Sequence, residues 1–154
     1  MDPDLRELLS ALKAHSVKYL VIGAYAVGVH AEPRATKDLD IWIKADAENS
    51  RAVFRALAAF GAPLTGLSPN DFNDEAGSVF QMGQPPLRVD ILQRIDGVTF
   101  EDAWQNRMVT QIGGELPAFV ISAEDLIRNK LAAGRPQDLL DVTKVQKAQA
   151  ERSG

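Results

Sequence analysis

Two aspartates, Asp38 and Asp40, lie two positions apart in the short stretch DLDIWI at residues 38–43. Side chains of a β-strand alternate between its faces, so both carboxylates are expected on one face and Leu39 and Ile41 on the other. Neighbouring carboxylates repel each other unless a cation or a shared proton lies between them. The pair therefore predicts a cation site, and oxygen ligands favour Mg2+ or Mn2+.

A third aspartate, Asp90, alternates with apolar residues in a second strand-like stretch, LRVDIL at residues 87–92. If the strands 38–43 and 87–92 are neighbours in one sheet, the three acids Asp38, Asp40 and Asp90 converge. This arrangement suits two-metal catalysis, in which the ions activate an attacking hydroxyl and stabilise pentavalent phosphorus. The alternative is that Asp40 and Asp90 form ordinary ion pairs with arginines at a sheet edge.

Residues that could bind phosphate lie on both sides of the first acid strand. Gly23 stands between an apolar strand and a small-residue helix, where backbone N–H groups can hold a phosphate, although tight packing alone also explains a glycine there. Arg34, Thr36 and Lys37 lie in the loop that leads into the acid strand. Their side chains could neutralise triphosphate oxygens, or they could simply be solvated.

Further charged residues lie near the C-terminus. Lys130 lies in a predicted helix among apolar neighbours, so its ammonium group could reach a phosphate or only extend to solvent. Asp138 and Asp141 are one helical turn apart and share a face with Arg135, and ion pairs within or between helices are the favoured role for them. Residues 126–154 hold more bases than acids, which is consistent with a polyanion contact or with a solvated helix face.

Composition narrows the choice of protein class. The chain has 154 residues, 45% of them hydrophobic and 25% charged, as in a globular protein with one domain over residues 1–154. Because it has no cysteine and two histidines, disulfides and thiolate or histidine-rich zinc sites are not expected. No apolar run has the length of a membrane span, and the N-terminus does not resemble a signal peptide. We therefore expect a cytoplasmic protein that does not bind membranes.

Helical and strand patterns alternate along the chain, which predicts an α/β (α+β) protein with a mixed, twisted sheet flanked by helices. The late strands are expected to pair as hairpins, and residues 122–150 are expected to form a short helical extension that frays after about residue 148. Helices are predicted at 3–15, 24–31, 47–60, 100–105, 122–134 and from 136, and strands at 18–22, 38–43, 78–82, 87–92, 109–112 and 118–121.

The string IGAYAVGVHAEPRATKDLDIWI resembles the signature of the polymerase-β-like nucleotidyltransferase superfamily. That signature is an apolar strand, Gly-Gly or Gly-Ser, Asp-x-Asp on the next strand, and a third acid on a later strand. Gly23-Ala24, Asp38, Asp40 and Asp90 stand at those places, although Ala24 has no hydroxyl group. The string SAEDLIRNKLAAGRPQDLLDV is similar to the tail of the AbiEii-type branch, which includes toxins of toxin–antitoxin systems.

The resemblance implies a nucleotidyltransferase-like fold and Mg2+-dependent (or Mn2+-dependent) transfer of a nucleoside monophosphate from an NTP to an acceptor hydroxyl. It implies that Asp38, Asp40 and Asp90 are catalytic metal ligands and that Gly23, Ala24, Arg34, Thr36, Lys37 and Lys130 bind the nucleotide. The implied acceptor is RNA such as tRNA, a protein or a small molecule, and the implied partner is a cognate antitoxin. The alternative from another class is a non-catalytic nucleotide-binding or protein-binding module, either a degenerate transferase or antitoxin-like.

Overall fold

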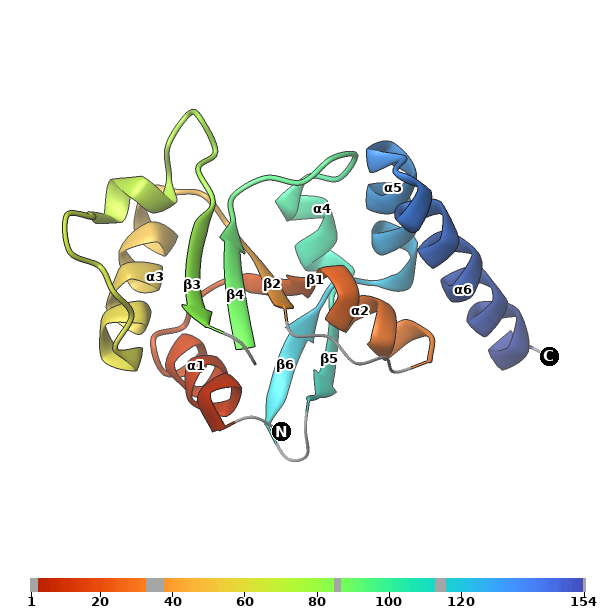
Figure 1. Cartoon of the computed structure of the whole chain (residues 1–154), viewed down its shortest axis with the longest axis horizontal. Coiled ribbons are helices and arrows are strands. Elements are labelled where there is room, and N and C mark those ends of the chain that lie inside the picture. The colour runs from red at the N-terminus through yellow and green to blue at the C-terminus, as the bar shows by residue number, and fades with distance from the viewer. Residues whose placement is uncertain (1–2, 33–37, 85–86, 113–115, 154) are drawn as a thin grey trace.

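The computed structural model of the chain describes residues 3–32, 38–84, 87–112 and 116–153. Helices and strands alternate along it (Figure 1). The helices are α1 (Pro3–Ala14), α2 (Gly23–His30), α3 (Ala47–Phe60), the 3-10 turn η1 (Pro69–Phe72), α4 (Phe100–Gln105), α5 (Ala123–Ala133) and α6 (Pro136–Ser153). The strands are β1 (Tyr19–Ile22), β2 (Asp38–Ile43), β3 (Phe80–Gln84), β4 (Leu87–Leu92), β5 (Met108–Gln111) and β6 (Pro117–Val120).

The strands form one mixed sheet in the order β3-β4-β2-β1-β6-β5. The pairs β3–β4, β1–β2 and β5–β6 are antiparallel, whereas β2–β4 and β1–β6 are parallel. The predicted mixed sheet and the two late hairpins are thus confirmed. The acid-bearing strands β2 and β4 are direct neighbours in the middle of this order, which places the candidate site on the sheet rather than on a loop.

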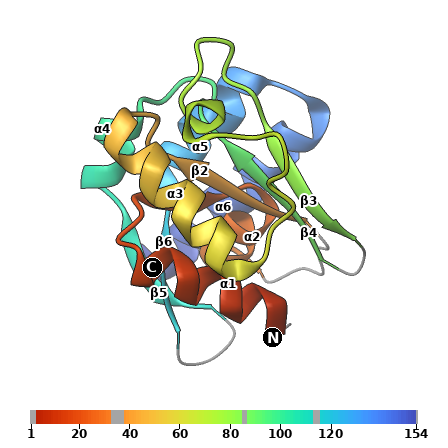
Figure 2. The ribbon, with the colours of Figure 1, turned by 90° about the vertical axis from the view of Figure 1, so that its left-hand side faces the viewer.

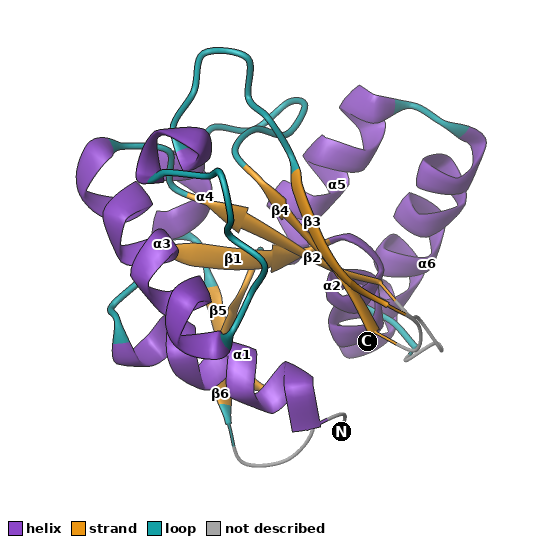
Figure 3. Cartoon of the chain, turned by 60° about the vertical axis from the view of Figure 1, so that its left-hand side comes forward, coloured by secondary structure: helices purple, strands orange, loops and turns teal. Residues whose placement is uncertain are grey.

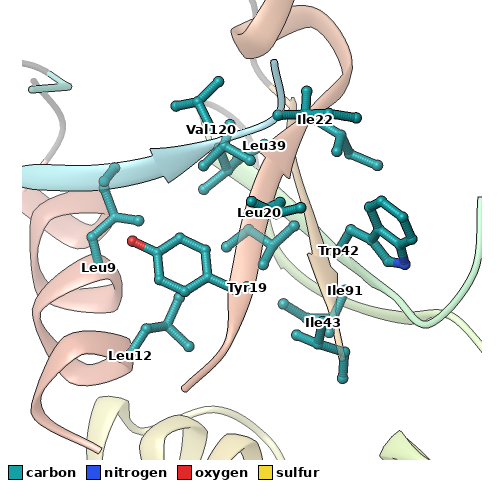
Figure 4. Packing of buried hydrophobic residues seen from close by; sticks show 14 of the residues in the cluster. Leu9, Leu12, Tyr19, Leu20, Ile22, Leu39, Trp42, Ile43, Ile91 and Val120 are labelled. Atoms are coloured by element: carbon teal, nitrogen blue, oxygen red, sulfur yellow. The ribbon is translucent and has the colours of Figure 1, made fainter. Parts of the chain in front are cut away.

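Helices cover both faces of the sheet. Figures 2 and 3 show α1 and α3 on one side and α2, α5 and α6 on the other. On the α1 side, Tyr19 of β1 is fully buried, and Figure 4 shows its ring beside Leu9 and Leu12 of α1. This apolar packing is the main stabilising contribution to the fold and holds the central strands rigidly in place.

Short sequence signals set the helix ends. Asp46 caps α3 by accepting a hydrogen bond from Asn49 N at 2.7 Å, and Ser122 caps α5 by accepting one from Asp125 N at 3.1 Å. Gly61 and Gly134 end these two helices in the left-handed conformation. The cap at Ser122 was expected from the sequence, and it fixes where α5 starts relative to the strand before it.

One predicted boundary is wrong. Fraying was expected after about residue 148, but α6 continues to Ser153. Its last turns are held by tertiary contacts, because Arg152 donates to the His30 carbonyl oxygen and Gln149 Nε2 donates to Glu124 Oε1 at 3.3 Å. Such contacts between distant segments cannot be read from the sequence of a single helix. No helix among the described residues is long and apolar enough to cross a membrane.

Candidate active site

The parallel register of β2 and β4 brings the predicted acids together. Asp40 is paired with Asp90 and Asp38 with Arg88. Residues paired across parallel strands project from the same face, so Asp38, Asp40 and Asp90 share one face of the sheet. The predicted neighbourhood of the two acid strands is therefore confirmed.

Gly23 closes one side of this acid group. Its φ of +67° lies in the left-handed region, and a Cβ atom added there would overlap Asp40 Oδ2 and lie 3.1 Å from Asp40 Cγ. Ile22, the residue before it, is the register partner of Asp40 on the antiparallel strand β1. A glycine is therefore required both by the backbone conformation and by the close approach of the Asp40 carboxylate.

The start of α2 leaves backbone donors at the same place. No side chain caps this helix, whose N-cap residue is Ile22. The first N–H groups of a helix have no partner within the helix, so those of Gly23 and Ala24 are donors at the edge of the acid group. The backbone can therefore offer hydrogen bonds to a phosphate even though Ala24 lacks a hydroxyl group.

The acids create an unfavourable charge environment for one another. Burial, and after it the nearby charges of Asp90 and Asp38, raise the pKa of Asp40 from 3.8 to about 6, against the opposing charges of Lys130 and Arg88. The ionised Asp40 therefore lacks sufficient positive charge around it. A cation bound at its carboxylate would supply that charge.

Asp90 has one basic partner in the structure. Arg88 Nε lies 3.3 Å from Asp90 Oδ1, and both side chains are partly exposed. The alternative of an ordinary ion pair with an arginine thus holds for Asp90, whereas Asp40 forms no such pair with any residue that the structure describes. An exposed or half-exposed pair of this kind contributes little stability and can rearrange when a ligand binds.

The acids do not form a closed metal site by themselves. Within the described parts of the chain, no three carboxylate or imidazole side chains form a group that could hold a metal ion. The three carboxylates were expected to converge on one point. In the structure they share a face of the sheet and a common register, but they do not form a closed group. Magnesium commonly takes only one or two protein carboxylates and completes its shell with water and substrate phosphates. The oxygen donors present and the excess negative charge at Asp40 fit such an ion.

A buried ion cluster joins α5 and α6. Lys130 Nζ lies 3.2 Å from Asp138 Oδ1 and 3.2 Å from Asp141 Oδ2, and the exposed fraction of Lys130 is only 9%. The preference for ion pairs at Asp138 and Asp141 is confirmed. The Lys130 ammonium, which has three N–H donors, is thus already paired with two carboxylates.

One more basic residue joins this cluster, although it was not among the predicted site residues. Arg135 donates from Nε to Asp138 Oδ2 at 2.7 Å and from Nη2 to Asp138 Oδ1 at 3.2 Å. These bonds, followed by those of Lys130, lower the pKa of Asp138 to about 2. The sequence signal was Arg135 three residues before Asp138, but this spacing alone does not distinguish a surface pair from a group near the acids.

Two further polar side chains have packing roles, and the candidate phosphate-binding loop is not among the described residues. Trp42 is a core residue, since its indole Nε1 donates to Gln93 O at 3.2 Å and its ring packs edge-on against Phe100. His30 has a packing role, because its buried Nε2 lies 2.6 Å from the carbonyl oxygen of Ile121 and burial lowers its pKa. The loop residues Arg34, Thr36 and Lys37 lie outside the described residues.

The fold is similar to those of several solved nucleotidyltransferases. The lincosamide antibiotic adenylyltransferase LnuA, solved with lincomycin bound, is 16% identical with a TM-score of 0.60 over 96% of this chain and 98% of that chain. A candidate nucleotidyltransferase from Thermotoga maritima is 18% identical (TM-score 0.55; 97% and 88% covered). The antibiotic-resistance factor ANT(2'')-Ia is 10% identical (TM-score 0.57; 96% and 82% covered).

A family model decides the assignment at the sequence level. A search of curated proteins found no significant match. The model described as "Nucleotidyltransferase of unknown function (DUF6036)" matches residues 1–149, which is nearly the whole chain. The mixed sheet, the Asp38-x-Asp40 strand beside the Asp90 strand, and the helix beginning at Gly23 agree with that description. The chain belongs to the DUF6036 nucleotidyltransferase family.

Proposed function

We propose that this protein is a magnesium-dependent nucleotidyltransferase that moves a nucleoside monophosphate from an NTP to an acceptor hydroxyl. The observation that carries this proposal is the direct pairing of Asp40 with Asp90 across β2 and β4, with Gly23 packed against the Asp40 carboxylate. A half-buried pair of acids beside the start of a glycine-led helix has no evident packing purpose. It is suited to holding a metal ion between carboxylates and phosphate.

In this proposal Asp38 and Asp40 hold Mg2+, or Mn2+, and Asp90 completes the ligand set when a nucleotide is present. The ion supplies Lewis-acid stabilisation of charge on the phosphoryl oxygens. Burial, and after it the charges of Asp90 and Asp38, raise the pKa of Asp40 to about 6, which supports the assignment because a divalent ion would stabilise the ionised carboxylate. Gly23 and Ala24 present backbone N–H groups to the triphosphate.

The transfer itself forms one bond and breaks one bond. The acceptor oxygen bonds to the α-phosphorus of the NTP, and the bond from that phosphorus to the oxygen bridging to the β-phosphate breaks, releasing pyrophosphate. The hydroxyl proton passes to the Asp90 carboxylate. Positioning and electrostatic stabilisation carry most of the catalysis in such reactions.

Positive charges on two sides would offset the charge of the triphosphate. We place Arg34, Thr36 and Lys37 on the nucleotide, since they directly precede the acid strand. Lys130 contributes its charge to the same region, because its ammonium already lowers the pKa of Asp40. Charge-assisted contacts to phosphate are among the stronger interactions that a protein can make.

Two versions of this proposal differ in the acceptor of the nucleoside monophosphate. One is an RNA end, such as tRNA, which would fit an AbiEii-type toxin restrained by a cognate antitoxin. Exposed Lys144 and Lys147 on α6, beside a groove of about 490 Å3 between α2 and α6, would favour a polyanion. The other is a small-molecule hydroxyl, supported by the fold similarity to LnuA, described as a lincosamide adenylyltransferase, and to the resistance factor ANT(2'')-Ia.

The alternative function is a non-catalytic module that binds nucleotide or a protein partner. Ala24 favours it, because the usual serine hydroxyl is absent. Asp38, Asp40 and Asp90 oppose it, since a binding module has no need of all three acids. The two functions differ in one observable, which is the appearance of a labelled product.

The test incubates the purified protein with Mg2+ and each of the four α-32P-labelled NTPs. Total RNA, a protein extract and a panel of hydroxyl-bearing small molecules serve as acceptors in parallel. We expect transfer to one acceptor class, lost in Asp38→Asn and Asp40→Asn and retained in Asp102→Asn, an exposed aspartate on α4. Metal-dependent NTP binding without transfer to any class would support the binding module instead.

A further inference from the structure

Arg135 is held in place unusually firmly for an exposed side chain. Its side chain is 75% exposed, yet Nε and Nη2 form a bidentate pair with Asp138, and its backbone N–H donates to Asp138 Oδ2 at 3.2 Å. Long surface side chains normally lose conformational entropy when they are fixed in one geometry. A fixed guanidinium at the surface is therefore already ordered for an incoming ligand.

The partner of Arg135 is itself fixed by burial. Asp138 is 1% exposed and is also bound by Lys130, which in turn pairs with the fully buried Asp141. Gln137 Nε2 donates to Asp141 Oδ1 at 3.0 Å and completes this cluster. The buried charges thus form a rigid base that extends from α5 through α6 to the exposed guanidinium of Arg135.

This guanidinium belongs to the junction of α5 and α6, helices on the same side of the sheet as the acids. Asp40 pairs with Ile22 of β1, which points away from the face of Tyr19 and α1, so Asp40 projects toward the side that α2, α5 and α6 cover (Figure 3). Hydrogen bonding to Asp138 is the main cause that raises the pKa of Arg135, and the charges of Asp96 and Asp40 contribute in the same direction. The loop that carries Asp96 is packed on α5, because Asn129 Nδ2 donates to Asp96 O at 2.9 Å. A Cβ atom on Gly97 would lie 2.7 Å from Ala132 Cβ, which shows how close the loop and helix are.

We propose that Arg135 binds a phosphate of the nucleoside triphosphate, with the Lys130–Asp138–Asp141 cluster as the support that positions it. This inference rests on the proposed function, and it adds a binding residue outside the loop and the glycine turn. Nη1 of Arg135 makes no hydrogen bond to any described residue and remains available for a phosphate oxygen. Arginine suits this role because its planar group can keep one carboxylate and bind a second anion along another edge.

A simple surface ion pair would serve stability alone, and the chain offers one for comparison. Arg128 Nη1 lies 3.1 Å from Asp125 Oδ1, with Arg128 66% exposed and Asp125 buried. Arg128 therefore resembles Arg135 in residue type, exposure and partner. Asp138, the partner of Arg135, belongs to the buried cluster with Lys130 and Asp141.

The test measures binding of Mg·ATP, AMP and adenosine by isothermal titration calorimetry to the wild-type protein and to Arg135→Gln, Arg135→Lys and Arg128→Gln. A charged hydrogen bond to phosphate predicts at least a tenfold weaker affinity of Arg135→Gln for Mg·ATP, in order of magnitude. Adenosine affinity should be unchanged. Arg135→Lys should recover only part of the loss, because a lysine cannot keep the bidentate geometry. Arg128→Gln should bind all three ligands within about twofold of the wild-type affinity.

The possible results separate this inference from the proposed function. If the wild-type protein binds Mg·ATP and Arg135→Gln binds it equally well, the Arg135 assignment is wrong while the nucleotide proposal stands. If Arg135→Gln loses ATP and adenosine affinity in equal measure, its effect is structural and the assignment is also wrong. If the wild-type protein binds no nucleoside triphosphate, both proposals fail. Far-UV circular dichroism of each variant confirms that it is folded.

Discussion

Asp40 on β2 and Asp90 on β4 are register partners in a parallel strand pair, so their carboxylates share one face of the sheet. Two acids in this relation destabilise each other when both are ionised and no cation is bound. Gly23 packs closely against Asp40, since a Cβ atom at position 23 would overlap the carboxylate. The repulsion between these acids therefore lowers the stability of the fold at the place where we propose that a metal ion and a nucleotide bind.

The first prediction concerns the pH dependence of stability in metal-free protein. Burial, then Asp90 and Asp38, raise the pKa of Asp40 from 3.8 to about 6. Between these two values the folded state binds more protons than the unfolded state, so the Asp40 contribution to stability falls as pH rises and is constant above the window. Asp40→Asn should therefore be more stable than wild type above pH 6.5, by about 1–3 kcal/mol.

Thermal unfolding from pH 4 to pH 8 in EDTA measures this effect. The difference in Tm between Asp40→Asn and wild type should be small at pH 4 and should grow up to about pH 6.5. Saturating Mg2+ should reduce it, since the ion supplies the missing positive charge. A difference that does not change with pH would show that the charge of Asp40 is not the cause.

The second prediction concerns Gly23. A Gly23→Ala variant should lose both stability and transfer activity, because alanine is strained at a φ of +67° and its methyl group would overlap Asp40. Gly134→Ala is a matched control. It has the same φ of +67°, but its added Cβ would meet only Leu131 O, at 3.6 Å.

Both glycine variants should lose about 1 kcal/mol through backbone strain, and Gly23→Ala should lose about 1–3 kcal/mol more through overlap. Urea unfolding gives the comparison. Equal losses in the two variants would mean that the Asp40 carboxylate simply moves aside, and the close approach would then have no consequence for the site.

Much of the fold was predictable from the sequence for local reasons. Alternation of apolar residues gives the strands, and Ser122 and Gly134 define α5 by capping. The pairing of Asp40 with Asp90 followed from their placement on two apolar strands, once those strands were assumed to be neighbours. The sequence left that neighbourhood as a condition, since the pairing of β2 with β4 depends on tertiary structure.

The parts that could not be predicted depend on contacts between distant segments. In the sequence, Lys130 is a lysine flanked by apolar residues. Only the packing of α6 on α5 shows that its ammonium group pairs with two buried aspartates. Arg135 was expected only in an ordinary ion pair on one helix face with Asp138 and Asp141, because its spacing to Asp138 is that of any helical ion pair. The last turn of α6 was expected to fray, but Arg152 joins it to α2 through the His30 carbonyl oxygen.

The third prediction concerns the buried cluster. Lys130→Met removes the ammonium group between Asp138 and Asp141 and leaves two buried carboxylates with less positive charge. Removing one member of a buried ion cluster costs about 3–5 kcal/mol, so the free energy of unfolding should fall by that amount. Lys144→Met, which changes an exposed lysine on α6, should alter it by no more than about 0.5 kcal/mol.

Guanidinium unfolding of the two lysine variants provides this measurement. If Lys130→Met were as stable as wild type, α5 and α6 would be held by their apolar contacts alone. The cluster would then have no supporting role for Arg135.

The most direct test of the central claim is the binding of Mn2+ in the presence of a non-hydrolysable NTP analogue, measured by electron paramagnetic resonance. Wild-type protein and Asp102→Asn should take up Mn2+ together with the analogue, whereas Asp38→Asn and Asp40→Asn should weaken uptake at least tenfold, as expected for the loss of a carboxylate ligand. Equal Mn2+ uptake by wild type and Asp40→Asn would contradict the assignment of these acids as the metal site.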